Sequence, residues 1–351
     1  MRIGRLVVRA LTITAALGGI FLFGFLVYVS GPAQVVRQMA SVGVAGALAV
    51  LGSVILSMAF WSLSWFALLY GAGLTTSWPS LFAPLLAGYA VTYITPSAYL
   101  GGEPVRAYWV ARLRRVPMAQ VMGTVVVERI LAGVAVLLFV CLGGFVALTQ
   151  PGVSRGDRYA VALGLAVMAA FLGLGVAAVI RQAHWLSAFL RWLGRGMRFR
   201  GWLARAAARV AETETEVHRA FSQYLPMTAL SFLLQLLGVF VSYMRPQLFF
   251  FFTGRDLFTF AQLSLYFTLS TFINAFLWVS PGGFGLTDGG RVGVFTLLGI
   301  SPSGAMAFNL VFRFAEMLVA GVGLFLLVRQ GLLRFRRGKV EVRVEEHPPR
   351  G

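Results

Sequence analysis

Long apolar runs, each about the length of a bilayer crossing, dominate the chain. A transmembrane helix needs about 20 mostly apolar residues to cross a hydrocarbon core about 30 Å thick. Six runs reach that length and predict six crossing helices: 11–29, 44–70, 118–148, 159–180, 226–252 and 303–328. The first run follows three arginines, as in a signal peptide, but it exceeds the roughly 7–15 residues of a signal core. We therefore interpret it as an anchoring helix, and the phenylalanines at 249–252 as lipid contacts.

Two further apolar runs, 80–95 and 258–280, each end at a proline that is followed by glycines. If 80–95 crossed the membrane, Arg112, Arg114 and Arg115 would lie outside, against the tendency of arginine to stay cytoplasmic. A hairpin that enters and leaves on the cytoplasmic side keeps these arginines inside. If 258–300 also enters and leaves the membrane on one side, the C-terminal tail stays inside as well. The pattern predicts an all-α polytopic membrane protein with six crossing helices plus two re-entrant helical hairpins.

Composition and charge agree with this topology. Hydrophobic residues make up 58% of the chain and charged residues 12%, while the net charge is +18. In the predicted topology 21 of the 30 Lys and Arg lie inside, four lie outside and five lie within membrane segments. The bias explains the positive charge without nucleic acid as a partner. It predicts a multi-pass protein of the cytoplasmic membrane with cytoplasmic N- and C-termini. One cysteine and three scattered histidines predict no disulfide framework, no metal site and no cofactor.

Residues 1–330 are predicted to form a single membrane domain, with two smaller segments outside the bilayer. Residues 184–224 are a cytoplasmic amphipathic segment in which apolar residues recur at near-helical spacing. The apolar residues of its helix are Leu203, Ala207, Val210, Val217 and Phe221. Its arginines would meet anionic membrane lipids if it lies on the inner membrane face, and a solvated linker helix is the alternative. Residues 331–351 form a basic, then acidic, cytoplasmic tail.

The two breaks after the shorter runs resemble each other. "TPSAYLGGEPVR" at 95–106 aligns with "SPGGFGLTDGGR" at 280–291 at an offset of 185, which also places Pro117 on Pro302. The alignment predicts one repeat at about 44–148 and a second at about 226–328, which the topology orients oppositely. Inverted repeats with broken helices at corresponding places are typical of secondary transporters that bind substrate near the bilayer midplane.

The breaks supply backbone that can pack closely or adopt positive φ near that midplane. Half-helices of about 10–16 residues rise 15–24 Å, enough to reach the middle of the bilayer. The residues predicted to form the hairpin backbone are Pro96, Gly101, Gly102, Pro281, Gly282, Gly283 and Gly285. Irregular backbone at that depth must be buried in protein or line a wet cavity.

Charged residues lie at the two tips and early in the helices that follow them. Each costs about 2.5–3.5 kcal/mol at the bilayer centre, so they must face inward and largely pair. The candidate substrate-binding residues are Glu103, Arg106, Glu128, Arg129, Asp288, Arg291, Arg313 and Glu316. The alternative is purely structural pairing, for example of Arg313 with Glu316 one turn away. Four arginines balance four carboxylates, and Arg245 adds a surplus charge if it also faces inward. Guanidinium groups suit phosphate, so an anionic or zwitterionic lipid is favoured, although proton coupling through the carboxylates is also compatible.

Three patches carry a resemblance to a known family. "GGEPVRAYWVAR" (101–112), "VVVERIL" (125–131) and "SPGGFGLTD" (280–288) resemble the motifs of the flippase-like membrane family, which includes the flippase domain of the lysylphosphatidylglycerol synthase known as multiple peptide resistance factor. The resemblance covers about residues 5–330 and implies lipid translocation across the cytoplasmic membrane. Asp288 stands where the family pattern usually has glutamate. The 351 residues include no aminoacyl-transfer domain, so the resemblance leaves the lipid open.

The leading functional hypothesis is therefore a flippase for a phospholipid or polyprenyl-phosphate lipid, working by alternating access. An ion or small-molecule antiporter is the second hypothesis. A non-catalytic subunit of a polyprenyl-linked glycosyl transfer system is the third. An enzyme is not expected, because the sequence shows neither an Asp-x-Asp metal pair nor a nucleophile beside a base. A homo-oligomer is compatible with the sequence.

Overall fold

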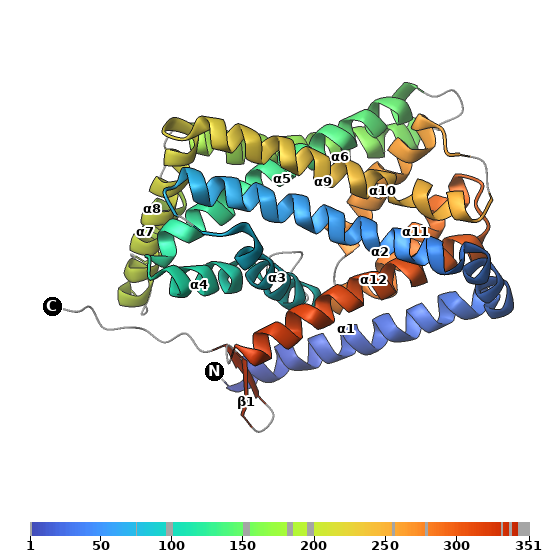
Figure 1. Cartoon of the computed structure of the whole chain (residues 1–351), viewed down its shortest axis with the longest axis horizontal. Helices are drawn as coiled ribbons and strands as arrows, with labels where there is room; N and C mark the ends of the chain where they lie inside the picture. The colour runs from blue at the N-terminus through green and yellow to red at the C-terminus, as the bar shows by residue number, and fades with distance from the viewer. Residues whose placement is uncertain are drawn as a thin grey trace.

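The computed structural model describes residues 2–74, 76–95, 101–149, 155–180, 185–194, 200–254, 257–277, 280–330, 333–336 and 339–342. These residues form a helical bundle with one short antiparallel β-hairpin in the tail (Figure 1). The elements are α1 (Arg2–Val29), α2 (Pro32–Gly71), the 3-10 helix η1 (Trp78–Leu81), α3 (Phe82–Ile94), α4 (Glu103–Arg114), α5 (Met118–Thr149), α6 (Arg155–Ile180), α7 (Trp185–Gly194), α8 (Arg200–Ser222), α9 (Leu225–Phe252), α10 (Phe260–Leu277), the 3-10 helix η2 (Pro281–Gly283), α11 (Leu286–Leu297), α12 (Pro302–Arg329), β1 (Leu333–Arg336) and β2 (Lys339–Val342).

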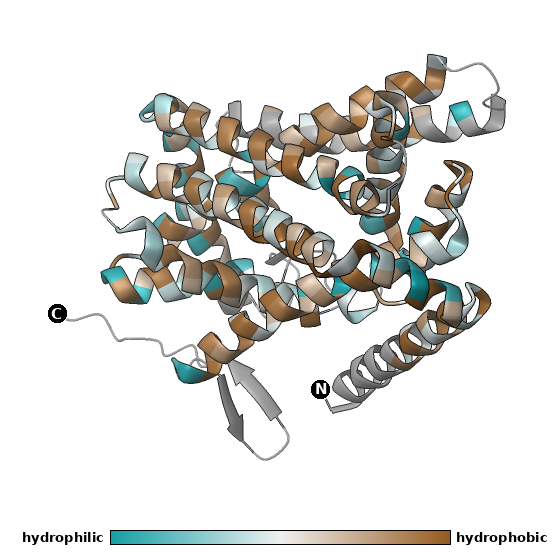
Figure 2. Cartoon of the chain, turned by 45° about the vertical axis from the view of Figure 1, so that its right-hand side comes forward, coloured by the Kyte–Doolittle hydropathy of each residue, from teal (hydrophilic) through white to brown (hydrophobic). Residues whose placement is uncertain are grey.

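All six apolar runs that predict crossing helices fall within helices, namely α1, α2, α5, α6, α9 and α12. Five helices of the described chain are long and apolar enough to cross a membrane: Pro32–Gly71, Met118–Val146, Leu225–Phe252, Phe260–Leu277 and Pro302–Arg329. Helix α1 adds the shorter apolar stretch Leu17–Val29. Hydrophobic residues extend along the long helices (Figure 2), and many of their large apolar side chains are exposed. Such a surface suits contact with lipid.

Helix α10 is longer than the half-helix expected from the run at 258–280. It spans 18 residues, about 27 Å at 1.5 Å per residue, whereas α3, α4 and α11 span 13, 12 and 12 residues. Neither proline nor glycine interrupts the chain between Phe260 and Leu277, so nothing ends the helix earlier. The two arms of the second hairpin are therefore unequal.

The two hairpins lie at opposite ends of the bundle, and their breaks face its middle (Figure 1). The α3–α4 hairpin lies at the end that also holds α7 and α8, while α10 and α11 lie at the other end. Helix α1 begins and α12 ends at the same end of the bundle as α7 and α8. This arrangement points the inner ends of α3 and α10 toward the middle of the bundle.

Glycines let the arms of the hairpins touch the long helices backbone to backbone. Helix α3 packs on α12, and a Cβ on Gly323 of α12 would overlap the Leu86 carbonyl oxygen of α3. Helix α10 packs on α5, and a Cβ on Gly143 of α5 would overlap the Ser264 carbonyl oxygen of α10. Each hairpin thus rests on the long helix that follows the other hairpin in the sequence.

The glycines of the two breaks serve different purposes. In the second break Gly282, Gly283 and Gly285 have φ of +64°, +68° and +82°, a region that other residues rarely adopt. In the first break Gly102 has φ of −97°, and its use is close approach, because its Cα lies against the backbone of Gly88. Gly101 is half-buried beside it, Pro281 opens η2, and Pro96 lies outside the described residues.

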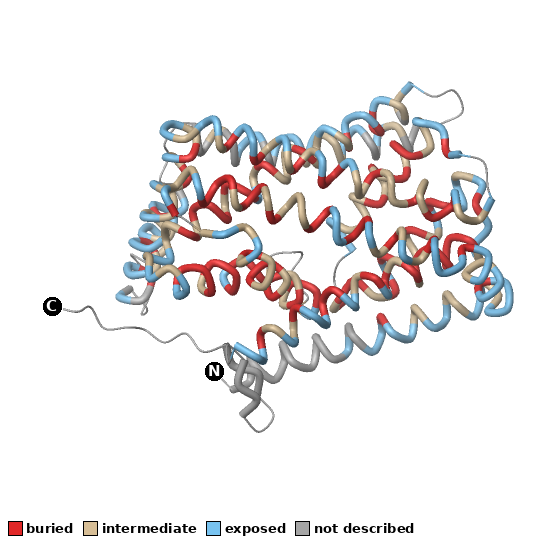
Figure 3. Tube along the Cα trace, viewed as in Figure 1, coloured by how far each residue is buried: buried red, intermediate tan, exposed pale blue. Residues whose placement is uncertain are grey.

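An aromatic core joins α9, α10, α11 and α12. Phe249 and Phe250 are buried, and Phe249 packs edge-to-face with both Phe250 and Phe308. Tyr266 stacks on Phe295 with ring centroids 4.4 Å apart. Buried residues concentrate on the inner helices (Figure 3). The interpretation of the four phenylalanines as lipid contacts is therefore wrong for the first two, because α9 turns that face toward α12.

Helices α7 and α8, which fall within the segment at 184–224, close one end of the bundle. Leu203, Ala207 and Val217 of the predicted apolar face are buried, and Val217 packs with Val127 and Leu131 of α5. The apolar face of α8 is thus covered by protein rather than by lipid or water. Sequence periodicity identified the face, but which surface covers it depended on the fold.

We predict that Gly102→Ala destabilises the protein, because the added Cβ would overlap the carbonyl group of Gly88 and force α3 and α4 apart. Overpacking of this kind costs about 1–3 kcal/mol. The apparent melting temperature in detergent should fall by several degrees. Gly293→Ala in α11 is the matched control, because open space surrounds its Cβ position and the helix gains from alanine. Equal melting temperatures for the two variants would contradict the packing described here.

Candidate functional site

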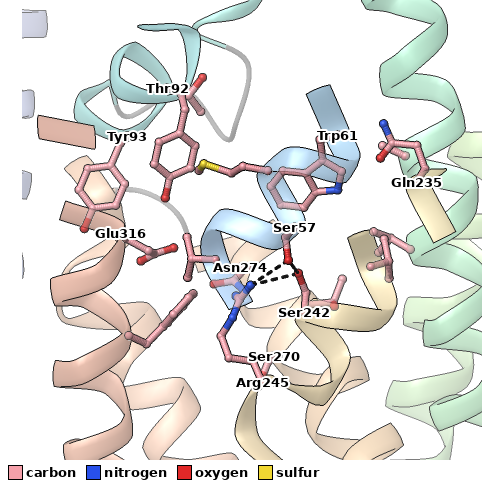
Figure 4. Close-up of a pocket in the computed structure, with 18 of the residues that line it drawn as sticks. Ser57, Trp61, Thr92, Tyr93, Gln235, Ser242, Arg245, Ser270, Asn274 and Glu316 are labelled. Atoms are coloured by element: carbon pink, nitrogen blue, oxygen red, sulfur yellow. Dashed lines mark hydrogen bonds between the residues drawn. The ribbon is translucent and has the colours of Figure 1, made fainter. Parts of the chain in front are cut away.

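A cavity of about 380 Å³ lies between the two breaks, enclosed by α2, α3, α4, α5, α9, α10, α11 and α12. Its charged lining residues are Arg106, Glu128, Arg129, Arg245, Arg291 and Glu316. The polar side chains of Ser57, Thr92, Gln235, Ser242, Ser270 and Asn274 line it as well (Figure 4). No group of three or more His, Cys, Asp or Glu that could hold a metal ion occurs in the described part of the chain. Five of the eight predicted substrate-binding residues thus line a single cavity, namely Arg106, Glu128, Arg129, Arg291 and Glu316.

The first hairpin is fastened to α5 by a buried ion pair. Arg106 of α4 donates through Nη2 to Glu128 of α5, and both side chains are almost fully buried. Gln235 of α9 donates to the other carboxylate oxygen of Glu128 at 3.1 Å. The Arg106 guanidinium lies 4.8 Å from the ring centroid of Trp65. Its Nε and Nη1 have no hydrogen-bond acceptor among the described residues.

A second ion pair joins the same two helices at the rim of the cavity. Arg129 Nη2 lies 2.9 Å from Glu103 Oε1. Glu103 is buried, whereas the Arg129 side chain is 45% exposed, so the cavity approaches the protein surface at this residue. Glu103 thus pairs with Arg129 rather than with Arg106 of its own tip.

The second hairpin is fastened to α12 by an ion pair in which the hairpin supplies the carboxylate and the long helix supplies the arginine. Arg313 of α12 donates through Nε to Asp288 Oδ1 at 2.8 Å, and through Nη1 to the Gly282 carbonyl oxygen at 2.6 Å. Asp288 Oδ2 accepts from the backbone N–H of Gly285 at 3.0 Å. Both charged groups sit behind the cavity wall and hold the glycine-rich break in shape. The suggested pairing of Arg313 with Glu316 is wrong, because Asp288 occupies the guanidinium.

The remaining charged residues, Arg245, Arg291 and Glu316, face the cavity without a close ion-pair partner among the described residues. Arg291 donates through Nη2 to Asn274 Oδ1 at 3.1 Å, while its Nη1 lies 4.0 Å from Asp288 and makes no hydrogen bond with the described residues. Arg245 donates to the hydroxyls of Ser53, Ser57 and Ser242. Glu316 points into the same space (Figure 4), and its Oε2 has no hydrogen-bond partner in the described structure.

Sequence reasoning missed the neutral part of this wall. It flagged Arg245 as a surplus charge that depended on facing inward, and the structure places it in the cavity. Ser57 and Ser242 were not identified, although they are 185 residues apart, the offset of the two breaks, and their hydroxyls lie 3.2 Å from each other. Extending the repeat alignment from the breaks to the long helices would have found them.

Comparisons with known proteins identify relatives of the whole membrane region. The family model for the lysylphosphatidylglycerol synthase TM region matches residues 9–323. A UPF0104 membrane protein from Methanothermobacter thermautotrophicus is 26% identical over 328 residues, which cover 84% of this chain and 88% of the relative. A UPF0104 membrane protein from Methanocaldococcus jannaschii is 37% identical over 95 residues, which cover 27% of this chain and 26% of the relative. No solved structure matches the chain.

We predict that Arg106→Gln and Glu128→Gln each lower the free energy of unfolding by about 3–5 kcal/mol, because either change leaves one buried charge without its partner. The double substitution should cost clearly less than the sum of the two, since it removes both charges. Melting temperatures of the four proteins in detergent measure this cycle. The exposed pair of Glu216 and Arg219 on α8 is the control, and breaking it should cost at most about 1 kcal/mol. Additive single effects at the buried pair would rule out the coupling.

Proposed function

The chain belongs to the family of the lysylphosphatidylglycerol synthase transmembrane region, and on that premise we propose that it is a flippase for a phosphate-bearing lipid. The relative from M. thermautotrophicus, of which the match covers 88%, is named a membrane protein, which fits a multi-pass helical protein. The single observation that carries the proposal is the cavity between the two breaks, which four arginines and only two carboxylates line. A lipid headgroup needs such a shielded polar path, because a charge in the hydrocarbon core is costly.

The guanidinium groups support phosphate as the recognised group. Arg106 and Arg291 keep N–H donors without an acceptor among the described residues, and both residues line the cavity. Guanidinium forks match phosphate oxygens in bidentate geometry, and charge-assisted hydrogen bonds are about twice as strong as neutral ones. A bound phosphate would fill these vacant donor positions. The function is binding and translocation, so no residue is assigned a catalytic role.

Paired features of the two halves support an inverted repeat of 44–148 and 226–328. Ser57 and Ser242, equivalent at the offset of 185, touch each other between α2 and α9, as residues on a twofold axis would. The contact of α3 with α12 is matched by the contact of α10 with α5. Arg106 and Arg291, also equivalent, reach the cavity from the two hairpins. Alternating access would follow from rocking one repeat against the other around this axis.

The orientation proposed from the arginines is that α7, α8 and both termini face the cytoplasm. Their end of the bundle holds the start of α1, the end of α12 and the outer end of the α3–α4 hairpin (Figure 1). In this orientation the arginine-rich α8 would face the anionic inner leaflet.

We predict that Ser77→Cys and Met118→Cys, at the two ends of the first hairpin, react with a membrane-impermeant maleimide only in inverted vesicles. Leu257→Cys, at the opposite end of the bundle, should react in intact cells. All three positions are exposed, and the background substitution Cys141→Ala removes the native cysteine. Labelling of Ser77→Cys and Met118→Cys from opposite sides would show that α3 crosses the membrane and would overturn the re-entrant hairpin.

We predict that the purified chain in proteoliposomes translocates a fluorescent phospholipid or a polyprenyl phosphate, and that Arg291→Gln slows this translocation at least about tenfold, which corresponds to 1.4 kcal/mol. Arg291 is chosen because Arg313 still neutralises Asp288 in the variant. Arg291→Lys should recover part of the rate, since it restores the charge but not the fork. Arg112→Gln, at an exposed position of α4, is the control and should match the wild type.

Absence of lipid translocation by the folded wild type, with and without a proton gradient, would contradict the flippase. The antiporter and the non-catalytic subunit would then be the remaining hypotheses.

A further inference from the structure

The charged residues around the cavity do not balance. Five arginines and four carboxylates belong to the tips and the cavity wall: Arg106, Arg129, Arg245, Arg291, Arg313, Glu103, Glu128, Asp288 and Glu316. One positive charge is therefore left over. Two short stretches here lie outside the described residues, "PSAYL" at 96–100 in the first break and "WV" at 278–279 directly before the second. Neither contains a charged residue that could change this sum.

Three of the arginines are neutralised by direct ion pairs. Arg106 pairs with Glu128, Arg129 with Glu103, and Arg313 with Asp288. These pairs leave Arg245, Arg291 and Glu316 on the cavity wall. The excess charge is therefore located on this group of three, which we call the open triad.

Within the open triad, Arg245 is hydrogen-bonded by neutral hydroxyl groups, which do not compensate its charge. Its hydrogen-bond acceptors are hydroxyls, and each of these hydroxyls is fixed by a backbone carbonyl: Ser53 donates to Val50, Ser57 to Ser53, and Ser242 to Gly238. Because each hydroxyl proton is donated to a carbonyl oxygen, the lone pairs of the hydroxyl oxygen remain free to accept from the guanidinium. The seryl side chains thus orient Arg245 and supply no negative charge.

A shared aromatic ring brings the two arginines of the open triad together. The guanidinium carbons of Arg245 and Arg291 lie 4.8 and 5.2 Å from the ring centroid of Phe312. Glu316 follows Phe312 by one helical turn on α12, which places its carboxylate near both guanidinium groups. The other ionisable groups around the open triad are Tyr89 and Tyr93 of α3, Tyr266 of α10, Asp288 of α11 and Arg313 of α12.

We propose that the open triad selects a headgroup with one net negative charge, a phosphodiester monoanion, and this inference rests on the proposed lipid transport. Arg245 and Arg291 would then face two anions, the bound phosphodiester and the resident carboxylate of Glu316, and the loaded cavity would be neutral. Neutral lipids leave one buried positive charge uncompensated, and cationic lipids leave two. Buried charge without a partner is the costly state in a low-dielectric site.

Lipid binding to the purified full chain in detergent tests this selection. The probes are four dioctanoyl lipids at pH 8: phosphatidylglycerol with charge −1, phosphatidylcholine with charge 0, lysylphosphatidylglycerol and phosphatidic acid. Lysylphosphatidylglycerol carries a charge between 0 and +1, because its α-amino group is partly deprotonated at this pH, and phosphatidic acid carries a charge of about −2. The readout is the dissociation constant from thermal stabilisation. The wild type should bind phosphatidylglycerol at least about tenfold more tightly than the other three, a difference of about 1.4 kcal/mol.

Two substitutions should move the preferred charge in opposite directions. Glu316→Gln adds one unit of excess positive charge, so phosphatidic acid should become the tightest ligand. Arg245→Gln removes the excess, so phosphatidylcholine should become the tightest ligand. Arg112→Gln is the control and should retain the wild-type order, because it lies exposed at the end of α4. The order of the four lipid affinities is measured separately in each variant. If one variant fails to fold, the order in the other variant still tests the inference.

The outcomes separate this inference from the proposed function. Equal affinities for all four lipids, or the same order in both variants, would overturn the charge selection even if lipids are translocated. Charge-ordered binding without translocation would support the selection and contradict the flippase. Equally tight binding of water-soluble glycerophosphoglycerol would support the selection and identify a soluble phosphodiester as the ligand instead of a lipid.

Discussion

Neutralisation of charge in a low-dielectric interior governs how the two hairpins of this protein are held. Each second arm carries a charged residue that is buried against the following long helix, Arg106 with Glu128 and Asp288 with Arg313. The signs are reversed between the two halves, so the residues are not copies although the tethers are equivalent. A buried charge without its partner is strongly destabilising, so each pair fixes the second arm of its hairpin on a long helix.

Backbone contact complements these ion pairs. Gly143 and Gly323 bring each hairpin against the long helix of the opposite half, and Gly102 closes the first hairpin on Gly88. Gly102 and Arg106 of the first hairpin and Arg291 of the second thereby reach the same cavity. A site built on packed helices in this way keeps its arginines in defined positions.

The charged residues fall into two groups with different consequences. Residues that pair directly hold the hairpins in place. Arg245, Arg291 and Glu316 face the cavity with neutral acceptors, long contacts or no hydrogen-bond partner among the described residues. The first group accounts for stability, while the second group can replace its neutral hydrogen-bond acceptors with a bound ligand. Lipid transport, as proposed, would use the second group and leave the tethers intact.

The sequence by itself determined the long helices, the two breaks and the presence of inward-facing charges, because hydrophobic length, helix-breaking residues and the cost of intramembrane charge are local properties. The family resemblance was also readable from short motifs. Only the tertiary structure decided which charges pair, since Arg313 could reach Glu316 on its own helix but contacts Asp288 from α11. It also decided that Ser57 and Ser242 fix Arg245 in the cavity, and that Phe249 and Phe250 are buried. The physical reason is that pairing and burial depend on how helices distant in sequence rotate toward one another, which the periodicity of a single helix does not specify.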